Sequence, residues 1–570
     1  MRNTRKGAVG AVVALAAFGL ALAGCSQNTT NTPAPSGSAS GVTIDAAHSV
    51  GAMDSYAVGT TFKATEPIDI SLLYRDHSNY PEKDSWLIFS ALKANQNVSF
   101  NLTKVPLSDW QTKRSQYITT AANEPEVMPV FYSGEETQYV NSGALLPISD
   151  YVQYMPNFQK DLQDFGLSSY LDTKRQADGK YYQLPGLMQS VILQYSIIVR
   201  DDLWKAAGLT TDPTNLTELQ ADLQKLKDTN QCQVPLTAGN NAKDILQAWS
   251  PDYNTLVGDW AIQNGAQMWD GTTNQYVAAA AQPGAQTITT FMAGLVKAGL
   301  MDKDSMTQGT NDNSASDQKL ENGTACAVSG NYQDLARLQT ALQANGHDTT
   351  LHMLTLPQAP DGKTYITGGQ RFSSGMVFGA SLAKDPHFKA ILQFIDWLYY
   401  SPEGVEFAQW GVQCPNAQAS DTTCTYTKDA SGKRSLLPTI NNSQGLNPAA
   451  GKNAKMLNTD YGFSNGVFWP ANGTFNDLIL SYLPPAEQDF MARMAGVVER
   501  PTAPATPMDS DALEDVASYA QTLRDTQNQW TTDFIVGNKD PNTQWNDYQA
   551  ALKSAGVDKL VQLYNDNVKK

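Results

Sequence analysis

The sequence predicts an α/β protein built as two lobes. Its early body alternates strand and helix patterns, which indicates a parallel sheet covered by helices. The chain has 570 residues. After an N-terminal leader and spacer, about 510 residues remain, and one hydrophobic core stops growing near ~250–300 residues. We therefore expect two lobes, each with its own core.

The predicted elements of the first lobe follow from hydrophobic periodicity. Alternation predicts strands, apolar residues at helical spacing predict a helix, and Ser108-Asp109 can cap the next helix. In order, they are a strand at 68–74, a helix over 86–92, a strand at 98–105, a helix from Trp110 and a strand at 127–132.

Loops that follow the strands of such a sheet are candidate ligand loops, because ligands bind beyond the carboxyl ends of the strands. The loops at 75–79 and 132–136 hold the candidate site residues Asp76, His77, Tyr132 and Glu135. The alternative interpretation is that the acids are solvated loop residues and that His77 is a surface residue without a ligand.

Later segments supply further elements. A turn at Asp178-Gly179-Lys180 precedes a β-branched extended segment at 190–199. Helices are expected over 201–208, from residue 215, over 388–398 and from Ser401, where Ser401-Pro402-Glu403 provides a cap, a proline and an early acid.

Residues 1–24 are typical of a secretory signal peptide. A basic start (Arg2, Arg5, Lys6) precedes an apolar stretch at 8–23, and a small residue stands before Cys25. The last four residues, LAGC, resemble a bacterial lipobox, which implies acylation of Cys25. An ordinary signal peptide with a chance cysteine is the alternative. Residues 25–60 are then a lipid-anchored flexible spacer, since 26–42 hold no charge and almost nothing large and apolar.

The charge balance limits the partners. The net charge is −16, and loss of residues 1–24, which hold three basic and no acidic residues, leaves −19. Nucleic acid is excluded as a partner because its phosphates need lysine and arginine. A strongly anionic ligand is disfavoured unless local charge reverses the global field.

Four cysteines remain beyond Cys25. Cys414 and Cys424 bracket a short polar loop and are the expected pair, which leaves Cys232 and Cys326 for a second disulfide; free buried thiols are the alternative. The sequence has no zinc-type spacing and no EF-hand loop, so we expect no metal and no cofactor.

Several segments, in order, resemble the bacterial extracellular solute-binding proteins, family 1, that serve sugar ABC importers. They are DGKYYQLP at 178–185, the stretches at 195–208 and 213–219, GTACAVSGNY at 323–332 and the helix pair at 388–404. The tail at 534–564 resembles the ending of larger oligosaccharide-binding lipoproteins, among them the alginate-oligosaccharide binders.

The resemblance implies a periplasmic-binding-protein-like fold of two lobes with a crossover hinge, of the class II type. It places residues 61–190 plus 366–435 in an N-terminal lobe and 191–365 plus 436–570 in a C-terminal lobe. It implies a monomer, not an enzyme, that captures an oligosaccharide between the lobes and delivers it to ABC importer permease subunits. The protein would be lipid-anchored on the extracellular face of the cell membrane and touch the membrane only through its lipid.

Two alternatives stay open. The same fold could bind a peptide or another solute. A secreted glycoside hydrolase would need a fixed pair of carboxylates, and nothing in the sequence defines one.

Aromatic side chains are the expected ligand contacts, because sugars present apolar faces and a rim of hydroxyls. In proteins that this chain resembles, an aromatic at the turn of Tyr332 stacks on sugar. The alternative role for the aromatic candidates is packing within the protein, and the alternative role for Arg371 is an ion pair between the lobes. The further candidates are Trp260, Arg371, Phe372, Trp410 and Trp469.

Overall fold

The computed structural model describes residues 43–569, apart from short internal gaps. These gaps are 78–79, 121–124, 133, 192, 194, 259–266, 309–312, 370, 444, 452 and 465–474. The predicted signal peptide and Cys25 lie outside the described residues.

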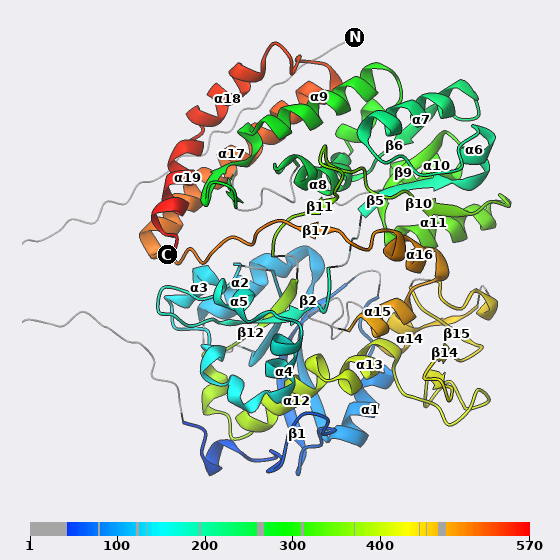
Figure 1. The fold of residues 1–570 in the computed structure, drawn as a ribbon. Helices are drawn as coiled ribbons and strands as arrows, with labels where there is room; N and C mark the ends of the chain where they lie inside the picture. Colours follow the sequence, from blue (N-terminus) through cyan, green and yellow to red (C-terminus); the bar gives the residue numbers. More distant parts are fainter. Residues whose placement is uncertain are drawn as a thin grey trace, which may run out of the picture. The chain divides into compact units, whose positions relative to one another are not determined.

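The first sheet has five strands in the order β2-β1-β3-β12-β4 (Figure 1). β1 pairs in parallel with β2 and β3, whereas β12 is antiparallel to both β3 and β4. The predicted strand–helix–strand–helix–strand order is therefore confirmed. The strands are β1 (Ile68–Asp76), β2 (Val98–Pro106), β3 (Val127–Phe131), β4 (Gln183–Leu187) and β12 (Phe372–Phe378).

The second sheet has four strands in the order β10-β5-β9-β6. β6 runs parallel to β9, and β5 is antiparallel to β9 and β10. The strand expected over 190–199 begins only at Tyr195. The strands are β5 (Tyr195–Arg200), β6 (Val234–Thr237), β9 (Ala325–Asn331) and β10 (Leu351–Met353).

Four two-stranded ladders complete the strands. The parallel pair β11–β17 joins two segments that are far apart in sequence, and β7–β8 is an antiparallel hairpin. Their bounds are β7 (Gln267–Asp270), β8 (Gln275–Ala278), β11 (Tyr365–Ile366), β13 (Tyr426–Lys428), β14 (Arg434–Leu436), β15 (Ile440–Asn441), β16 (Lys455–Met456) and β17 (Val498–Glu499).

Helices cover both sheets. Those that accompany the first sheet are α1 (Leu87–Gln96), α2 (Trp110–Thr120), α3 (Thr137–Val140), α4 (Pro156–Asp164), α5 (Ser168–Asp172), α12 (Phe388–Tyr400), α13 (Pro402–Trp410), α14 (Leu457–Tyr461) and α15 (Asn476–Tyr482). Those that accompany the second are α6 (Asp201–Ala206), α7 (Leu216–Asp228), α8 (Lys243–Trp249), α9 (Pro283–Lys297), α10 (Ser314–Glu321), α11 (Tyr332–Ala344), α16 (Pro485–Arg493), α17 (Ser510–Val536), α18 (Trp545–Ser554) and α19 (Val557–Asp566).

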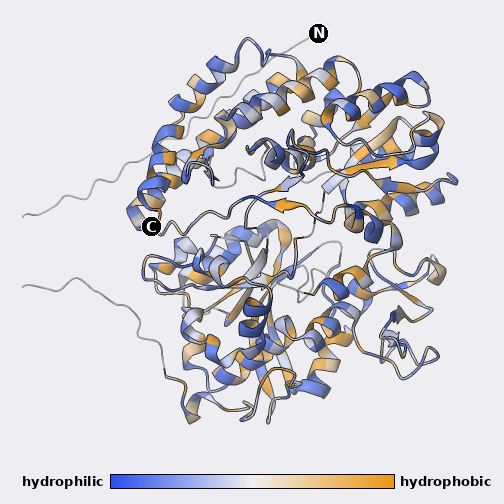
Figure 2. Ribbon diagram, in the orientation of Figure 1, coloured by the Kyte–Doolittle hydropathy of each residue, from blue (hydrophilic) through white to orange (hydrophobic). Residues whose placement is uncertain are grey.

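Each sheet has its own hydrophobic core, as the predicted two-lobed organisation requires. One core gathers β1, β3, β4 and β12 with α12, α13 and α15, and a smaller cluster packs on the other side of β3 around Trp110 and Phe131. The other core gathers β5, β6 and β9 with α7, α9, α16 and α17. Figure 2 shows hydrophilic and hydrophobic residues alternating along α17–α19, as expected for helices with one buried face.

The boundary between the lobes lies later than predicted. Leu437, Ile440 and Leu457 belong to the first core, not to the second lobe as expected. The Trp86 indole donates to the Thr459 carbonyl at 3.0 Å, which anchors this segment on α1. The chain passes between the cores within α15, where Leu478 joins the first core and Ile479 the second.

The spacer predicted at 25–60 is too long at its C-terminal end. Ala52 is part of the first core. The Gln393 side chain exchanges hydrogen bonds with the Met53 backbone at 2.9 and 3.0 Å. The Tyr56 hydroxyl donates to Asp396 at 2.9 Å. The described residues from 43 onward therefore form a strap along α12.

The structure contains both expected disulfides, Cys232–Cys326 and Cys414–Cys424. The first joins the segment before β6 to β9 inside the second lobe, and the second closes the loop after α13. Among the described residues, no helix combines the length and the hydrophobicity needed to cross a membrane.

A buried carboxyl, Asp396, fastens the strap, and a second buried carboxyl, Asp161, lies near it. Asp396 is 0% exposed and accepts from Tyr56, from the Asn157 backbone and side chain, and from the Phe158 backbone. Burial raises the pKa of Asp396 to about 6. Burial and the nearby Asp396 raise the pKa of Asp161 to about 8.

These two acids predict that stability falls as pH rises. The folded state keeps protons that the unfolded chain releases above ~pH 4, so the free energy of unfolding decreases from about pH 4 to pH 8. Between pH 5.5 and 8 we expect a loss on the order of 2 kcal/mol from Asp161, measured by urea unfolding. Asp161→Asn should flatten this dependence. A free energy of unfolding that rises over this range, or an unchanged slope in the variant, would contradict the account.

Candidate ligand-binding site

The carboxyl edge of the first sheet gathers aromatic side chains. β1 and β3 run parallel, so the residues that follow them meet at one edge. The His77 and Tyr80 rings stack at 4.4 Å with an interplanar angle of 12°. The pKa of Tyr80 is raised by burial and, to a smaller extent, by Tyr132, which places Tyr132 in its neighbourhood. Tyr132 itself is 51% exposed. We call His77, Tyr80, Tyr132 and Glu135 the first-sheet edge.

A buried arginine shapes this edge. Arg114 on α2 is 2% exposed, and its guanidinium lies 4.0 Å from the Phe131 ring centroid. It donates to the Val130 carbonyl at 3.0 Å and to Glu135 at 2.9 Å. The same Glu135 oxygen accepts from the Tyr132 backbone N–H at 2.9 Å. One cation therefore fixes the whole turn that presents Tyr132.

The turn begins at a strained residue. Val130 has φ +61°, in the left-handed region that a β-branched side chain rarely adopts. The register between β3 and β12 pairs Phe131 with Gly375 and Pro129 with Met376, so Val130 has no partner across the ladder. A bulge of this kind redirects the chain and is typical of functional sites. It turns Tyr132 away from the ladder.

Asp76 and Glu135, two predicted ligand residues, therefore have structural partners. Asp76 accepts from the Glu82 backbone at 2.9 Å and closes the loop that carries His77 and Tyr80. Glu135 is held by Arg114. Both carboxylates shape the edge, and the aromatic side chains form its surface.

Arg371 and Phe372 lie where β12 begins. The Arg371 guanidinium donates to the backbone carbonyls of Met188, Phe165 and Gln189 at 2.8, 3.0 and 2.6 Å. It therefore clamps the segment after β4. Phe372 meets Tyr170 edge-on at 6.0 Å, and the Tyr170 hydroxyl donates to Glu499 on β17.

The second sheet has a strained polar edge of its own. Asn240, Asn241 and Ala242, between β6 and α8, have φ of 57°, 55° and 54°. Three consecutive left-handed residues without glycine persist only where their surroundings impose them. A Cβ on Gly239 would lie 2.2 Å from the Asn313 side-chain oxygen, so only glycine fits beside Asn313.

Two side-chain oxygen atoms at this edge can accept hydrogen bonds that the described residues do not supply. The Oδ1 atoms of Asn241 and Asn313 are buried without a hydrogen-bond partner among the described residues. Nearby, Asp244 is 3% exposed, and burial and Asp334 raise its pKa to about 7. We call Asn240, Asn241, Asp244, Asn313 and Asp334 the second-sheet cluster. Buried polar atoms without partners mark a place where a ligand or water can bind.

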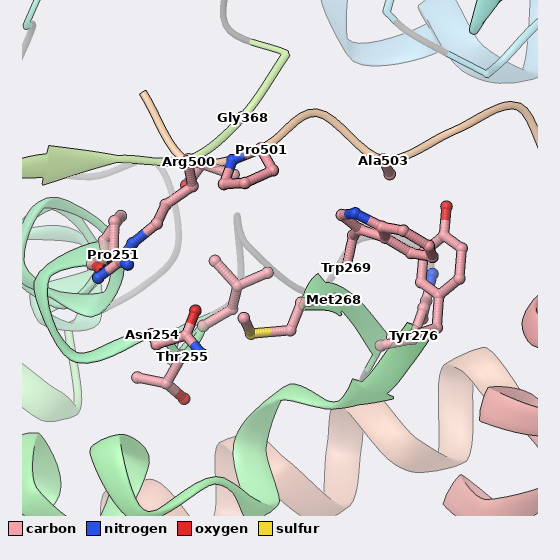
Figure 3. Close-up of a pocket in the computed structure, with 13 residues that line it drawn as sticks. Pro251, Asn254, Thr255, Met268, Trp269, Tyr276, Gly368, Arg500, Pro501 and Ala503 are labelled. Carbon is pink, nitrogen blue, oxygen red and sulfur yellow. Dashed lines mark hydrogen bonds between the residues drawn. The ribbon is translucent and has the colours of Figure 1, made fainter. Parts of the chain in front are cut away.

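A pocket of about 180 Å³ lies beside the paired strands β11 and β17 (Figure 3). Trp269 and Tyr276 from the β7–β8 hairpin meet edge-on at 5.3 Å on one side. On the other side the Arg500 guanidinium lies 3.6 Å from the Tyr365 ring centroid and donates to the Pro251 carbonyl at 2.9 and 2.7 Å. In Figure 3 the Trp269 indole faces Ala503, and Met268 lies between Asn254 and Trp269.

The prediction of Trp410 as a ligand residue is corrected by the structure. Its side chain is 0% exposed and packs in the first core against Tyr426 and Tyr482 at 5.7 and 5.6 Å. Trp260 and Trp469 lie outside the described residues. Tyr332 begins α11 directly after β9, but its side chain is not among those described.

Several site residues are not among the predicted ones. Tyr80 follows His77 in the same loop, and the paired turn and strand pattern at 267–278 could have indicated a hairpin with Trp269 and Tyr276 on it. Arg114 has no sequence signal, since it lies inside a polar helix. Among the described residues, no group of three or more His, Cys, Asp or Glu side chains is placed to hold a metal ion.

Arg114→Met should destabilise the protein, because it leaves Glu135 and the Val130 carbonyl without their cation. Removing one partner of a buried ion pair costs about 3 kcal/mol, to be measured by urea unfolding. Lys83→Met is the control, since Lys83 pairs with Asp460 of the same lobe where both side chains are partly exposed, and it should cost ~1 kcal/mol or less. Equal losses would contradict the role given to Arg114.

Comparison with known structures shows the fold. The chain is 15% identical to the alginate-binding protein AlgQ2, with a TM-score of 0.65 over 89% of this chain and 99% of that one. It is 16% identical to a solute-binding protein of Bifidobacterium longum infantis associated with an HMO-binding ABC transporter, with a TM-score of 0.61 over 88% and 98%. It is 16% identical to the Streptococcus pneumoniae ABC-transporter substrate-binding protein FusA in complex with kestose, with a TM-score of 0.59 over 88% and 98%.

The sequence itself identifies the family. A comparison with the curated proteins gives no match. The family model of bacterial extracellular solute-binding proteins, in contrast, matches residues 81–405, more than half of the chain. This segment runs from the loop after β1 to α13 and so includes the second-sheet cluster and, of the first-sheet edge, Tyr132 and Glu135. The two-lobed α/β fold agrees with that match, and the chain belongs to the bacterial extracellular solute-binding protein family.

Proposed function

We propose that this protein captures an oligosaccharide between its lobes and delivers it to an ABC importer. The observation that carries the proposal is the set of flat aromatic rings at the first-sheet edge and in the pocket of Trp269 and Tyr276 beside β11 and β17. Rings such as Tyr132 and Trp269 stack on the apolar faces of sugars. Buried amide oxygens of the second-sheet cluster can accept from sugar hydroxyls.

The relatives in fold support this ligand class. The proteins with similar structures are named for alginate, for HMO binding and for a complex with kestose. Closure of the lobes on ligand requires that the closed state binds it more tightly than the open state. We place the hinge at the paired strands β11 and β17, which run beside the aromatic pocket. Movement at these strands would couple closure of the lobes to ligand binding.

A thermal-shift screen tests the ligand class. Neutral oligosaccharides, uronate oligosaccharides and peptides are compared on the same protein. A ligand at ~100 times its Kd adds roughly 2.7 kcal/mol to the free energy of unfolding, so the melting temperature rises. We expect a shift with at least one saccharide. A shift with peptides alone would contradict the proposal.

Tyr132→Ala supplies the mutational arm of that screen. Loss of an exposed stacking ring should weaken saccharide binding about tenfold, since an aromatic contact is worth ~1–1.5 kcal/mol, while the unfolding midpoint stays unchanged. Tyr154→Ala is the matched control, because Tyr154 lies near Lys389 on α12 and away from both sheet edges. Equal affinities of the two variants would remove Tyr132 from the site.

We also propose that a lipid on Cys25 tethers the protein to the extracellular face of the membrane. A tether keeps the loaded protein near its importer and raises its local concentration there. Mass spectrometry of the protein extracted from membranes should find an acylated N-terminal Cys25, and Cys25→Ala should release the protein into the medium. An unmodified Cys25 would contradict the proposal.

A further inference from the structure

The pocket beside β11 and β17 presents mainly apolar groups to a ligand (Figure 3). A dry cavity of about 150 Å³ holds one benzene ring, so a volume of about 180 Å³ leaves room for one small ring or substituent. The apolar lining comes from the β7–β8 hairpin, the segment after α8 and the segment after β17. It includes Pro251, Leu256, Met268, Trp269, Pro501 and Ala503.

Most polar side chains of the lining already have partners. The Thr255 hydroxyl donates to a backbone carbonyl at 2.7 Å, and the Arg500 guanidinium donates to another at 2.9 and 2.7 Å. The Asn254 side chain bonds the carboxylate at the end of β7. Gln267 and Thr367 complete the polar lining, and the Gln267 Oε1 atom is buried without a partner among the described residues. Few polar atoms are therefore left to bind a ligand.

Such a lining suits a methyl group better than a hydroxyl group. A hydroxyl that enters the pocket gives up its hydrogen bonds to water, and its burial without a new partner costs free energy. A methyl group loses no hydrogen bond there, and burial of one such group is worth about a fourfold gain in affinity. Because most positions of a sugar carry hydroxyls, the pocket favours a sugar residue that carries a methyl group.

The aromatic wall of the pocket is held in place by the C-terminal helix. The Tyr276 backbone N–H donates to the Asn565 side-chain oxygen at 2.7 Å, and the amide of the same asparagine donates to the Tyr276 carbonyl at 2.9 Å. The Tyr276 and Tyr564 rings lie 5.0 Å apart. Helix α19 therefore fixes the hairpin that carries Trp269 before a ligand binds.

The opposite wall is fixed by two glycines around Pro501. A Cβ atom on Gly271 would lie 2.4 Å from the Pro501 ring, so the hairpin turn leaves no space for a side chain there. A Cβ atom on Gly368 would lie 2.5 and 2.6 Å from the carbonyl oxygens of Arg500 and Pro501. Because both contacts need glycine, Pro501 is wedged between the two segments and the pocket is preformed.

We infer that this pocket receives the methyl group of one modified sugar residue in the bound oligosaccharide, either that of an acetamido group or the C6 methyl of a 6-deoxyhexose. Both sources present the same chemistry, a methyl group on a sugar ring. The inference rests on the proposed oligosaccharide-binding function and goes beyond it, because it names the substituent that this part of the site selects.

Matched pairs of sugars test the inference. N-acetylglucosamine is compared with glucose, which differs at C2 alone, and L-fucose with L-galactose, which differs at C6 alone. Chitotetraose and cellotetraose repeat the first comparison in a longer chain. Saturation-transfer NMR at millimolar sugar shows which ligand protons contact the protein. Competition with the saccharide that gives the largest thermal shift supplies the affinities.

We expect the methyl-bearing sugar to bind at least about fivefold more tightly in one pair, with stronger saturation of its methyl protons than of its ring protons. The pair that shows the preference separates an acetamido from a 6-deoxy ligand. A smaller preference in every pair, or no binding by any of these sugars, would overturn the inference. A saccharide shift in the thermal screen would then leave the proposed function intact, whereas absence of every saccharide shift would overturn that function itself.

Ala503→Leu tests the pocket directly, because the larger side chain fills the space opposite the Trp269 indole (Figure 3). The variant should bind the preferred methyl-bearing sugar at least about fivefold more weakly and within twofold of its hydroxyl partner, with an unchanged unfolding midpoint. Ala550→Leu, at an exposed position of α18 in the same lobe, is the matched control and should keep the preference. An Ala503→Leu variant that keeps the full preference would show that the methyl group binds elsewhere and would overturn the inference.

Discussion

The buried guanidinium of Arg114 is the interaction on which the first-sheet edge depends. A cation that is 2% exposed is costly unless it is paired, and here Glu135, the Val130 carbonyl and Gln111 accept from its two terminal nitrogens while the face of Phe131 covers it. Its Nε–H is buried without a hydrogen-bond partner among the described residues. The partners of Arg114 all belong to β3, to the turn that follows it or to α2 itself. The arginine holds the carbonyl of the left-handed Val130, and Tyr132 follows with half of its surface exposed at the end of a buried strand.

Both lobes store strain where their strands end. Val130 interrupts the ladder of the first sheet, and Asn240 to Ala242 hold three left-handed conformations after β6. The cores beneath are closely packed, with α12 buried along almost its whole length. A rigid core can hold strained and unpartnered groups at its edge, where they are ready for a ligand. The paired strands β11 and β17 pass beside the aromatic pocket, so Trp269 and Tyr276 lie close to the strands where we propose the hinge.

Periodicity and caps were enough to predict strands β1, β2 and β3 of the first sheet and the α12–α13 pair, because these depend on local patterns of apolar residues, and chain length was enough to predict two lobes. The antiparallel strand β12 and its partner β4 were not predicted as part of that sheet, since their pairing joins segments that are far apart in sequence. The Cys414–Cys424 pair followed from a short loop. The lobe boundary could not be predicted, since residues 437–463 join the first core through contacts distant in sequence, such as Trp86 with Thr459.

The residues of the candidate site were harder to predict than the fold. Trp410 and Trp269 look alike as sequence, yet one is in the core and the other lines a pocket. Arg114 has meaning only through Val130 and Glu135, which no spacing rule connects.

The central claim is that a saccharide binds at the two sheet edges together. Hydrogen–deuterium exchange of the full chain, with and without the saccharide that gives the largest thermal shift, tests it most directly. The account predicts slower exchange in both the segment after β3, around residues 130–136, and the segment before α8, around residues 239–244, with α17–α19 unchanged. Protection confined to one of the two edges, or to α17–α19, would contradict it.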